Sequence, residues 1–168
     1  MNRDEIQEAA LGMGVNYEGI FNLSDLLFLI DSFFRKRGYI KKVENHTESY
    51  TENGRNINLK IRPYKKAKSN TLEIQVTINI QNIVDIRKQI DNLNAILQKG
   101  KVSITIDAFV LESKRGGFET RPEQLFIKTI FDKFLLGGGG KDYSGMVASE
   151  AKELKNEINA FLNLYKFL

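Results

Sequence analysis

Residues 71–80, TLEIQVTINI, alternate strictly between aliphatic and polar side chains. Successive side chains of a β-strand point to opposite faces, so this period of two predicts a strand that is buried on one face only. Such half-buried strands are typical of antiparallel sheets. Residues 101–113 repeat the pattern. The aliphatic face of this second segment consists of Val102, Ile104, Ile106, Ala108 and Val110.

A hairpin is predicted at the pair Asn53-Gly54, because both central positions of a type I′ turn favour residues that accept positive φ. With these two residues as the loop, Tyr50 is expected to face Ile57. The other face of the hairpin is polar and is expected to be wet. The expected core face consists of Tyr50, Ile57, Leu59 and Ile61.

Three segments carry the apolar period of an α-helix. The first begins at Asn22 or Ser24, either of which can cap it, and ends before Gly38. The second is predicted over 121–136 and the third over about 145–167. The apolar stripe of the third helix consists of Val147, Ala151, Leu154, Ile158, Phe161, Leu162 and Tyr165.

Three further segments are assigned from shorter patterns. Residues 3–10 are expected to form a short helix, within a flexible N-terminal segment over 1–14, and residues 15–21 a first strand. Residues 82–98 fit either a helix or a second hairpin turning at Asp91-Asn92. The helix is favoured, because apolar residues fall at heptad spacing. Those residues are Ile83, Ile86, Ile90, Leu93 and Leu97.

The order of elements predicts a single α+β domain over residues 1–168, in which an antiparallel sheet of about 4–6 strands is packed by helices. This order is similar to that of START-like helix-grip domains. In that family one strand and a short helical segment precede a curved sheet, and a long C-terminal helix closes a ligand cavity. The resemblance is one of topology, and it implies a cavity for an apolar ligand beneath residues 145–167.

The composition excludes several kinds of site. The chain has no cysteine, which excludes disulfides, thiolate metal ligands and cysteine catalysis. The longest apolar run, Leu26–Ile30, is far shorter than the roughly 20 residues of a membrane span. No secretory signal is recognised at the N-terminus, so a cytoplasmic location is expected. The net charge of +4 favours polyanions as partners.

Four glycines, 137–140, lead into Lys141 and suggest a phosphate-binding loop. That motif requires glycine where Leu135 stands and a hydroxyl residue where Asp142 stands, and it follows a strand rather than a helix. The match therefore fails at three points. Residues 137–144 are predicted to be a flexible hinge before the C-terminal helix, since glycine maximises backbone freedom.

Glu44, His46 and Glu48 share one face of the predicted hairpin, on the core side. Two carboxylates and an imidazole are groups that bind a divalent metal or carry out acid–base chemistry. A complete metal site also needs ligands from another element, and none is identified. Exposed or paired charges are the more common outcome for such a strand, so neither a metal nor a cofactor is expected.

Positive charge is concentrated in two segments, RKRGYIKK at 35–42 and KIRPYKKAK at 60–68, each with five cations and no acid. Cations alternating on a strand face with an aromatic among them are typical of platforms for single-stranded nucleic acid. A solvated edge strand protected by lysines is the alternative interpretation. The predicted contact residues are Arg35, Arg37, Lys41, Lys42, Lys60, Arg62, Tyr64 and Lys66.

No catalytic arrangement is recognised, so a small non-enzymatic binding module is expected. The leading hypothesis is contact between the basic hairpin and an anionic partner such as nucleic acid. One alternative is a helix-grip domain that binds an apolar small molecule. Another is a homodimer formed through the apolar stripes of the helices.

Overall fold

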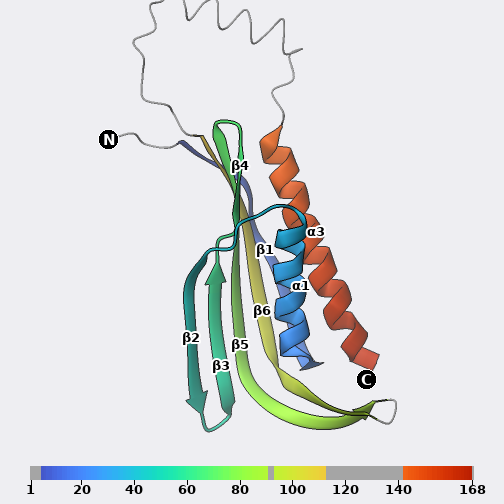
Figure 1. Ribbon diagram of the computed structural model, residues 1–168. Coiled ribbons are helices and arrows are strands. Elements are labelled where there is room, and N and C mark those ends of the chain that lie inside the picture. Colours follow the sequence, from blue (N-terminus) through green and yellow to red (C-terminus); the bar gives the residue numbers. More distant parts are fainter. Residues whose placement is uncertain (1–4, 91–92, 113–141, 168) are drawn as a thin grey trace, which may run out of the picture.

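The computed structural model describes residues 5–90, 93–112 and 142–167, in which a six-stranded antiparallel sheet is packed against two helices (Figure 1). This confirms the expected α+β class. The sheet order is β1-β6-β5-β3-β2, with β4 also paired to β5. The elements are β1 (Glu5–Phe21), α1 (Leu23–Lys36), β2 (Val43–Thr51), β3 (Gly54–Ile61), β4 (Tyr64–Ala67), β5 (Asn70–Ile90), β6 (Leu93–Glu112), α3 (Tyr143–Leu164) and the 3-10 turn η1 (Tyr165–Phe167).

Strands β5 and β6 form the centre of the sheet and carry both segments whose alternation predicted strands. Their register pairs Ile78 with Ile104, so the two aliphatic faces lie side by side. These residues are almost completely buried beneath the helices, and they form one core cluster with α1 and α3. The polar residues between them, such as Thr77 and Asn79, remain half-exposed on the opposite face.

The favoured helix over 82–98 is wrong, because β5 runs on to Ile90 and β6 begins at Leu93. Residues four apart share a face in a strand as well as in a helix, so the spacing of Ile86 and Ile90 fits both. Pairing decides the outcome, since Ile86 faces Leu97 and continues the central ladder. The far ends of β5 and β6 curve away from the rest of the sheet as a two-stranded arm (Figure 1).

The helix expected over 3–10 is also wrong, because β1 is a strand from Glu5 to Phe21. Ile6 pairs with Leu111, so tertiary pairing with β6 overrides the local helical pattern. Gly12 has φ 66° and lies where the register shifts between Ala10 and Met13. The glycine therefore allows an irregularity within one strand instead of ending a helix.

The β2–β3 hairpin turns one residue earlier than predicted. Thr51 pairs with Gly54, which places Tyr50 opposite Arg55 rather than Ile57. Gly54 is needed for close packing, because a Cβ atom there would lie 2.6 Å from the carbonyl oxygen of Ile83 on β5. Ile57 is buried in the core as expected, whereas Tyr50 is 78% exposed, so its assignment to the core was wrong.

Helix α1 begins and ends where its sequence predicts. The Asn22 side chain accepts a hydrogen bond from the Asp25 backbone N–H at 3.1 Å, which is an N-cap. Gly38 has φ 75° and follows the last turn, as a left-handed C-terminal cap requires. The buried face of the helix, which includes Ile30 and Phe33, packs into the core.

Helix α3 confirms the predicted C-terminal helix, and it lies across β1 and β6 beside α1 (Figure 1). The Asp142 side chain accepts a hydrogen bond from the Gly145 backbone N–H at 2.8 Å and caps the helix. Tyr143 and Ser144, expected in the hinge, are thus helical. The rest of the predicted hinge, 137–141, and the predicted helix over 121–136 lie outside the described residues.

Candidate functional site

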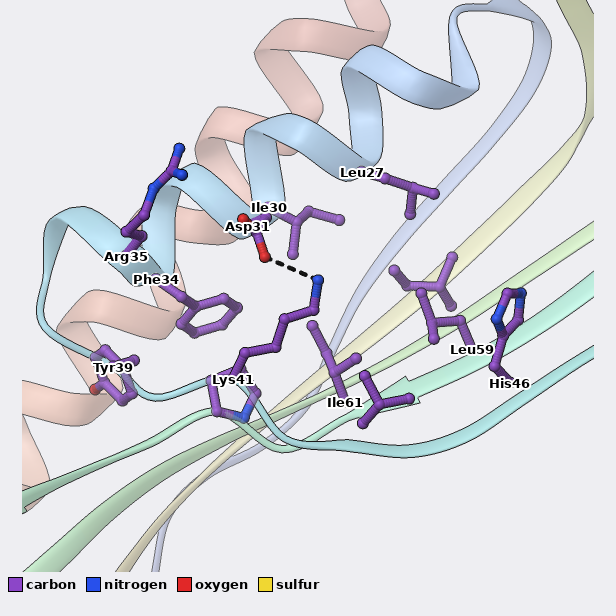
Figure 2. Close-up of a pocket in the computed structure, with 13 residues that line it drawn as sticks. Leu27, Ile30, Asp31, Phe34, Arg35, Tyr39, Lys41, His46, Leu59 and Ile61 are labelled. Atoms are coloured by element: carbon purple, nitrogen blue, oxygen red, sulfur yellow. Dashed lines mark hydrogen bonds and ion pairs between the residues drawn. The ribbon is translucent and has the colours of Figure 1, made fainter.

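A cavity of about 450 Å³ lies between α1 and the end of the sheet formed by β2 and β3 (Figure 2). The connector between α1 and β2, residues 37–42, closes one side of it. We call this space the α1 cavity. Its main apolar walls are formed by Leu27, Ile30 and Phe34 of α1, Leu59 and Ile61 of β3, and Ile78 of β5.

The floor of the α1 cavity is apolar and its mouth is open. Ile30, Phe34 and Ile78 are at most 3% exposed, so they belong to the core. Val43 is 52% exposed and lies at the entrance. A ligand entering the cavity would therefore exchange water for aliphatic and aromatic contacts, which is favourable.

The polar residues that line the α1 cavity are Asp31, Arg35, Tyr39, Lys41 and His46. Lys41 Nζ lies 2.9 Å from Asp31 Oδ1, an ion pair that joins the connector to α1 (Figure 2). The Arg35 guanidinium donates a long hydrogen bond to Ser32 Oγ at 3.4 Å. These side chains come from the polar side of α1, the connector and β2, around the apolar floor.

The cavity does not lie where the helix-grip resemblance implied. Helix α3 is packed directly on the sheet, and Val147, Leu154 and Ile158 are completely buried. The α1 cavity is instead lined by residues of α1, the connector, β2, β3 and β5, and by none of α3. Sequence alone named Arg35, Lys41 and His46, but for other roles, and it missed the apolar walls as a site.

The residues predicted to contact nucleic acid fall into two groups. Those of the first group are Arg35 on α1 with Arg37, Lys41 and Lys42 in the connector after it. Those of the second are Lys60 on β3, Arg62 just after it, and Tyr64 and Lys66 on β4. Ile40 and Tyr64 bridge the two groups through backbone hydrogen bonds of 2.7 and 3.0 Å.

Acids neutralise much of this basic surface. Arg37 Nη2 lies 2.8 Å from Glu153 Oε2 on α3. On the outer sheet face, Lys60 Nζ lies 3.2 Å from Glu44 Oε2 and Arg62 Nη1 lies 2.9 Å from Glu44 Oε1. Nucleic-acid binding by these residues stays a prediction, which a filter-binding titration at low salt would test.

Glu44 is separated from the other two candidate metal ligands by a β-bulge. The register of β2 against β3 shifts between Val43 and Asn45, which leaves Glu44 as the extra residue. Its carboxylate accepts a hydrogen bond from Arg62 and pairs with Lys60. The bond from Arg62 holds the pKa of Glu44 below its ordinary value. The Glu44 carboxylate is therefore already paired with two cations, Arg62 and Lys60.

His46 and Glu48 remain neighbours on β2, with 3.3 Å between His46 Nε2 and Glu48 Oε1. Arg55 also lies close to this carboxylate, with 3.6 Å between Arg55 Nη1 and Glu48 Oε2. Among the described residues, no group of three histidines and carboxylates is placed to hold a metal ion. The structure thus brings together two of the three predicted ligands and not the third.

A partly buried polar cluster that the sequence did not reveal joins α3 to the sheet. Lys65 Nζ on β4 lies 2.8 and 3.0 Å from the two carboxylate oxygens of Glu150 on α3. The Tyr39 hydroxyl donates a short hydrogen bond to the same carboxylate. Lys65 also lies 4.4 Å from the centre of the Tyr39 ring. We call these three residues the Glu150 cluster.

Alkaline pH should weaken the fold through Tyr39. Burial, with the nearby Glu150 carboxylate, raises the pKa of Tyr39 far above its ordinary value of 10.0. Below pH 10 the Tyr39 hydroxyl is protonated in both the folded and the unfolded state. Above pH 10 it ionises only in the unfolded state, so the free energy of unfolding falls as the pH rises. The slope is at most about 1.4 kcal/mol per pH unit.

Tyr39→Phe is therefore expected to make the free energy of unfolding less dependent on pH above about 10 than in the wild type. Urea unfolding at a series of pH values measures this slope. Tyr50→Phe, at an exposed position, is the matched control for loss of a tyrosine hydroxyl. Equal slopes in the wild type and Tyr39→Phe would show that the Tyr39 hydroxyl does not stay protonated in the folded state.

None of the described helices combines the length and the apolar character needed to span a membrane. The sequence matches no protein-family model and no curated protein sequence. Function is therefore inferred from the α1 cavity and the charged groups around it.

Proposed function

We propose that this protein is a non-enzymatic binding domain that holds an apolar small molecule in the α1 cavity. The observation that carries the proposal is the cavity itself, about 450 Å³ with core residues as its floor. Ligand sites are mostly clefts of roughly 300–1,000 Å³ with apolar walls and a few polar groups. The α1 cavity has this size and this distribution of groups.

The packing of the two helices supports the same proposal. Helix α3 buries its apolar stripe against β1 and β6, so it supplies a rigid side to the fold. Helix α1 packs against α3 on one side and faces the cavity on the other. A ligand can therefore fill the α1 cavity without disturbing the contact between α3 and the sheet.

The basic surface gives less support to the nucleic-acid hypothesis. Its cations Arg37, Lys60 and Arg62 each have a carboxylate oxygen within 3.2 Å. Protein cations drive binding by neutralising phosphates and so releasing the counterions condensed on the nucleic acid, and cations already paired with carboxylates neutralise fewer phosphates. Formation of a homodimer also stays a prediction, which light scattering would test.

Binding of a neutral apolar dye, Nile red, tests the proposal. We expect dye fluorescence to rise and shift to the blue on addition of the protein. Leu59→Trp should weaken dye binding by about tenfold or more, because the indole ring would fill the cavity from its half-buried wall.

Phe28→Trp is the matched control, since Phe28 is 64% exposed on α1 and does not line the cavity. Its affinity for the dye should equal that of the wild type. Thermal unfolding of both variants checks that they fold. The proposal fails if the wild type does not bind the dye, or if a folded Leu59→Trp variant binds it as tightly.

A further inference from the structure

We propose that the natural ligand is an amphiphile with an anionic head group, and that Lys41 binds this group at the mouth of the α1 cavity, with Arg35 adding positive charge beside it. The inference rests on the proposed function and adds the chemical class of the ligand. It is carried by the uneven distribution of charge around the cavity, by the kind of ion pair that holds Lys41, and by the surroundings of Arg35.

The charged side chains lie around the mouth of the α1 cavity, and together they carry a net positive charge. The floor consists of core residues such as Ile30 and Ile78, which offer no polar group. Two cations, Lys41 and Arg35, line the cavity together with one carboxylate, that of Asp31. A ligand would therefore lie with its apolar part inward and its polar part at these cations, which select an anion.

Lys41 is held by an ion pair that an incoming anion can replace. The distance of 2.9 Å to Asp31 is short, but the two side chains are 58% and 36% exposed. Ion pairs this exposed contribute little net free energy, because water solvates both charges well when they separate. The ammonium group sits on a flexible stem with three donors, so it can turn from Asp31 to a ligand.

Arg35 adds a second positive charge beside the mouth, although its guanidinium is directed away from Lys41 and Asp31 (Figure 2). It lies on α1 one turn after Asp31, and it lines the same cavity. No carboxylate of the described residues pairs with it, and its only side-chain hydrogen bond there is the long one to Ser32. Its charge therefore adds to the positive potential at the mouth of the cavity, which favours an anionic head group.

Displacement of Nile red by decanoic acid and by 1-decanol tests the inference at neutral pH. The two probes share a chain length and differ in head group. The wild type should bind the acid about tenfold more tightly than the alcohol, as charge-assisted hydrogen bonds predict. Raising the salt concentration should reduce this preference and leave the affinity for the alcohol unchanged.

Three variants separate the roles of the charges. Lys41→Met should bring the affinity for the acid close to that for the alcohol. Asp31→Asn should increase the preference for the acid, because Lys41 then has no competing partner. Lys42→Met is the matched control, since this neighbouring lysine does not line the cavity, and it should keep the wild-type preference.

The outcomes distinguish the two proposals. A preference for the acid that Lys41→Met removes and Asp31→Asn increases would support the anionic ligand. If the dye binds but the acid displaces it no better than the alcohol does, the head-group inference is overturned and the cavity remains a ligand site. If the wild type does not bind the dye, the proposed function itself is overturned.

Discussion

Leu154→Ala is expected to lower the free energy of unfolding by about 2–5 kcal/mol. Leu154 is completely buried on α3, where the helix packs against the sheet. Truncation removes its apolar contacts and leaves a void, because the long strands below cannot collapse around it. Urea denaturation, with the slope of the transition checked for constancy, measures the loss.

Leu164→Ala is the control on the same helix, because Leu164 is 70% exposed. It should change the free energy of unfolding by less than about 0.5 kcal/mol. A loss below about 1 kcal/mol for Leu154→Ala would contradict close packing between α3 and the sheet. It would also reopen the question of a ligand cavity beneath α3, which the helix-grip resemblance implied.

Removal of the carboxylate in Glu150→Ala is expected to cost about 2–3 kcal/mol of stability. Glu150 and Lys65 have side chains that are 17% and 18% exposed, so Lys65 would keep its charge in a mostly buried place without a partner. The Tyr39 hydroxyl would lose its acceptor as well. The remaining exposure allows some solvation, and the expected cost is therefore below that of a fully buried pair.

Glu157→Ala provides a matched acid-to-alanine change on α3. Its contact with Arg37 is 3.8 Å long and solvent-exposed, so the expected effect is small. The double variant Glu150→Ala/Lys65→Met should recover part of the lost stability, since it removes the unpaired ammonium group. No recovery would show that Lys65 reaches solvent once Glu150 is gone.

Periodicity predicted those segments of the fold in which all the apolar side chains face the same core. The alternation of residues 71–80 is unambiguous because five aliphatic side chains meet one core. The ends of α1 were predictable from Asn22 and Gly38, since caps depend on local backbone geometry. The apolar stripe of α3 was predictable because its side chains, like those of residues 71–80, meet one core.

The misassigned segments are those in which a distant partner decides between two local options. Residues 5–10 become a strand through pairing with β6. Residues 83–90 satisfy a helical spacing and a strand spacing equally, and their ladder with β6 selects the strand. The bulge at Glu44 depends on how β2 fits β3, so one side chain changes face without any local sign.

The candidate site was predictable only as separate residues. Lys41 and Arg35 were identified by their charge, yet the apolar walls beneath them come from α1, β3 and β5. Whether such walls meet or leave a cavity depends on how far the helix stands from the sheet, which no pattern in one sequence specifies. The Glu150 cluster likewise joins residues 85 and 111 positions apart.

The pairing of β1 with β6 sets the order in which the sheet can assemble. Ribosomal synthesis makes β1 before the other strands of the sheet. The residue opposite Tyr17 is Val102, however, so β1 can pair only after most of the sheet has been synthesised. The β5–β6 hairpin joins neighbouring segments and can form early at little entropic cost, whereas docking of β1 closes a long loop. Strand β1 thus leaves the ribosome before the other strands of the sheet and is among the last to pair.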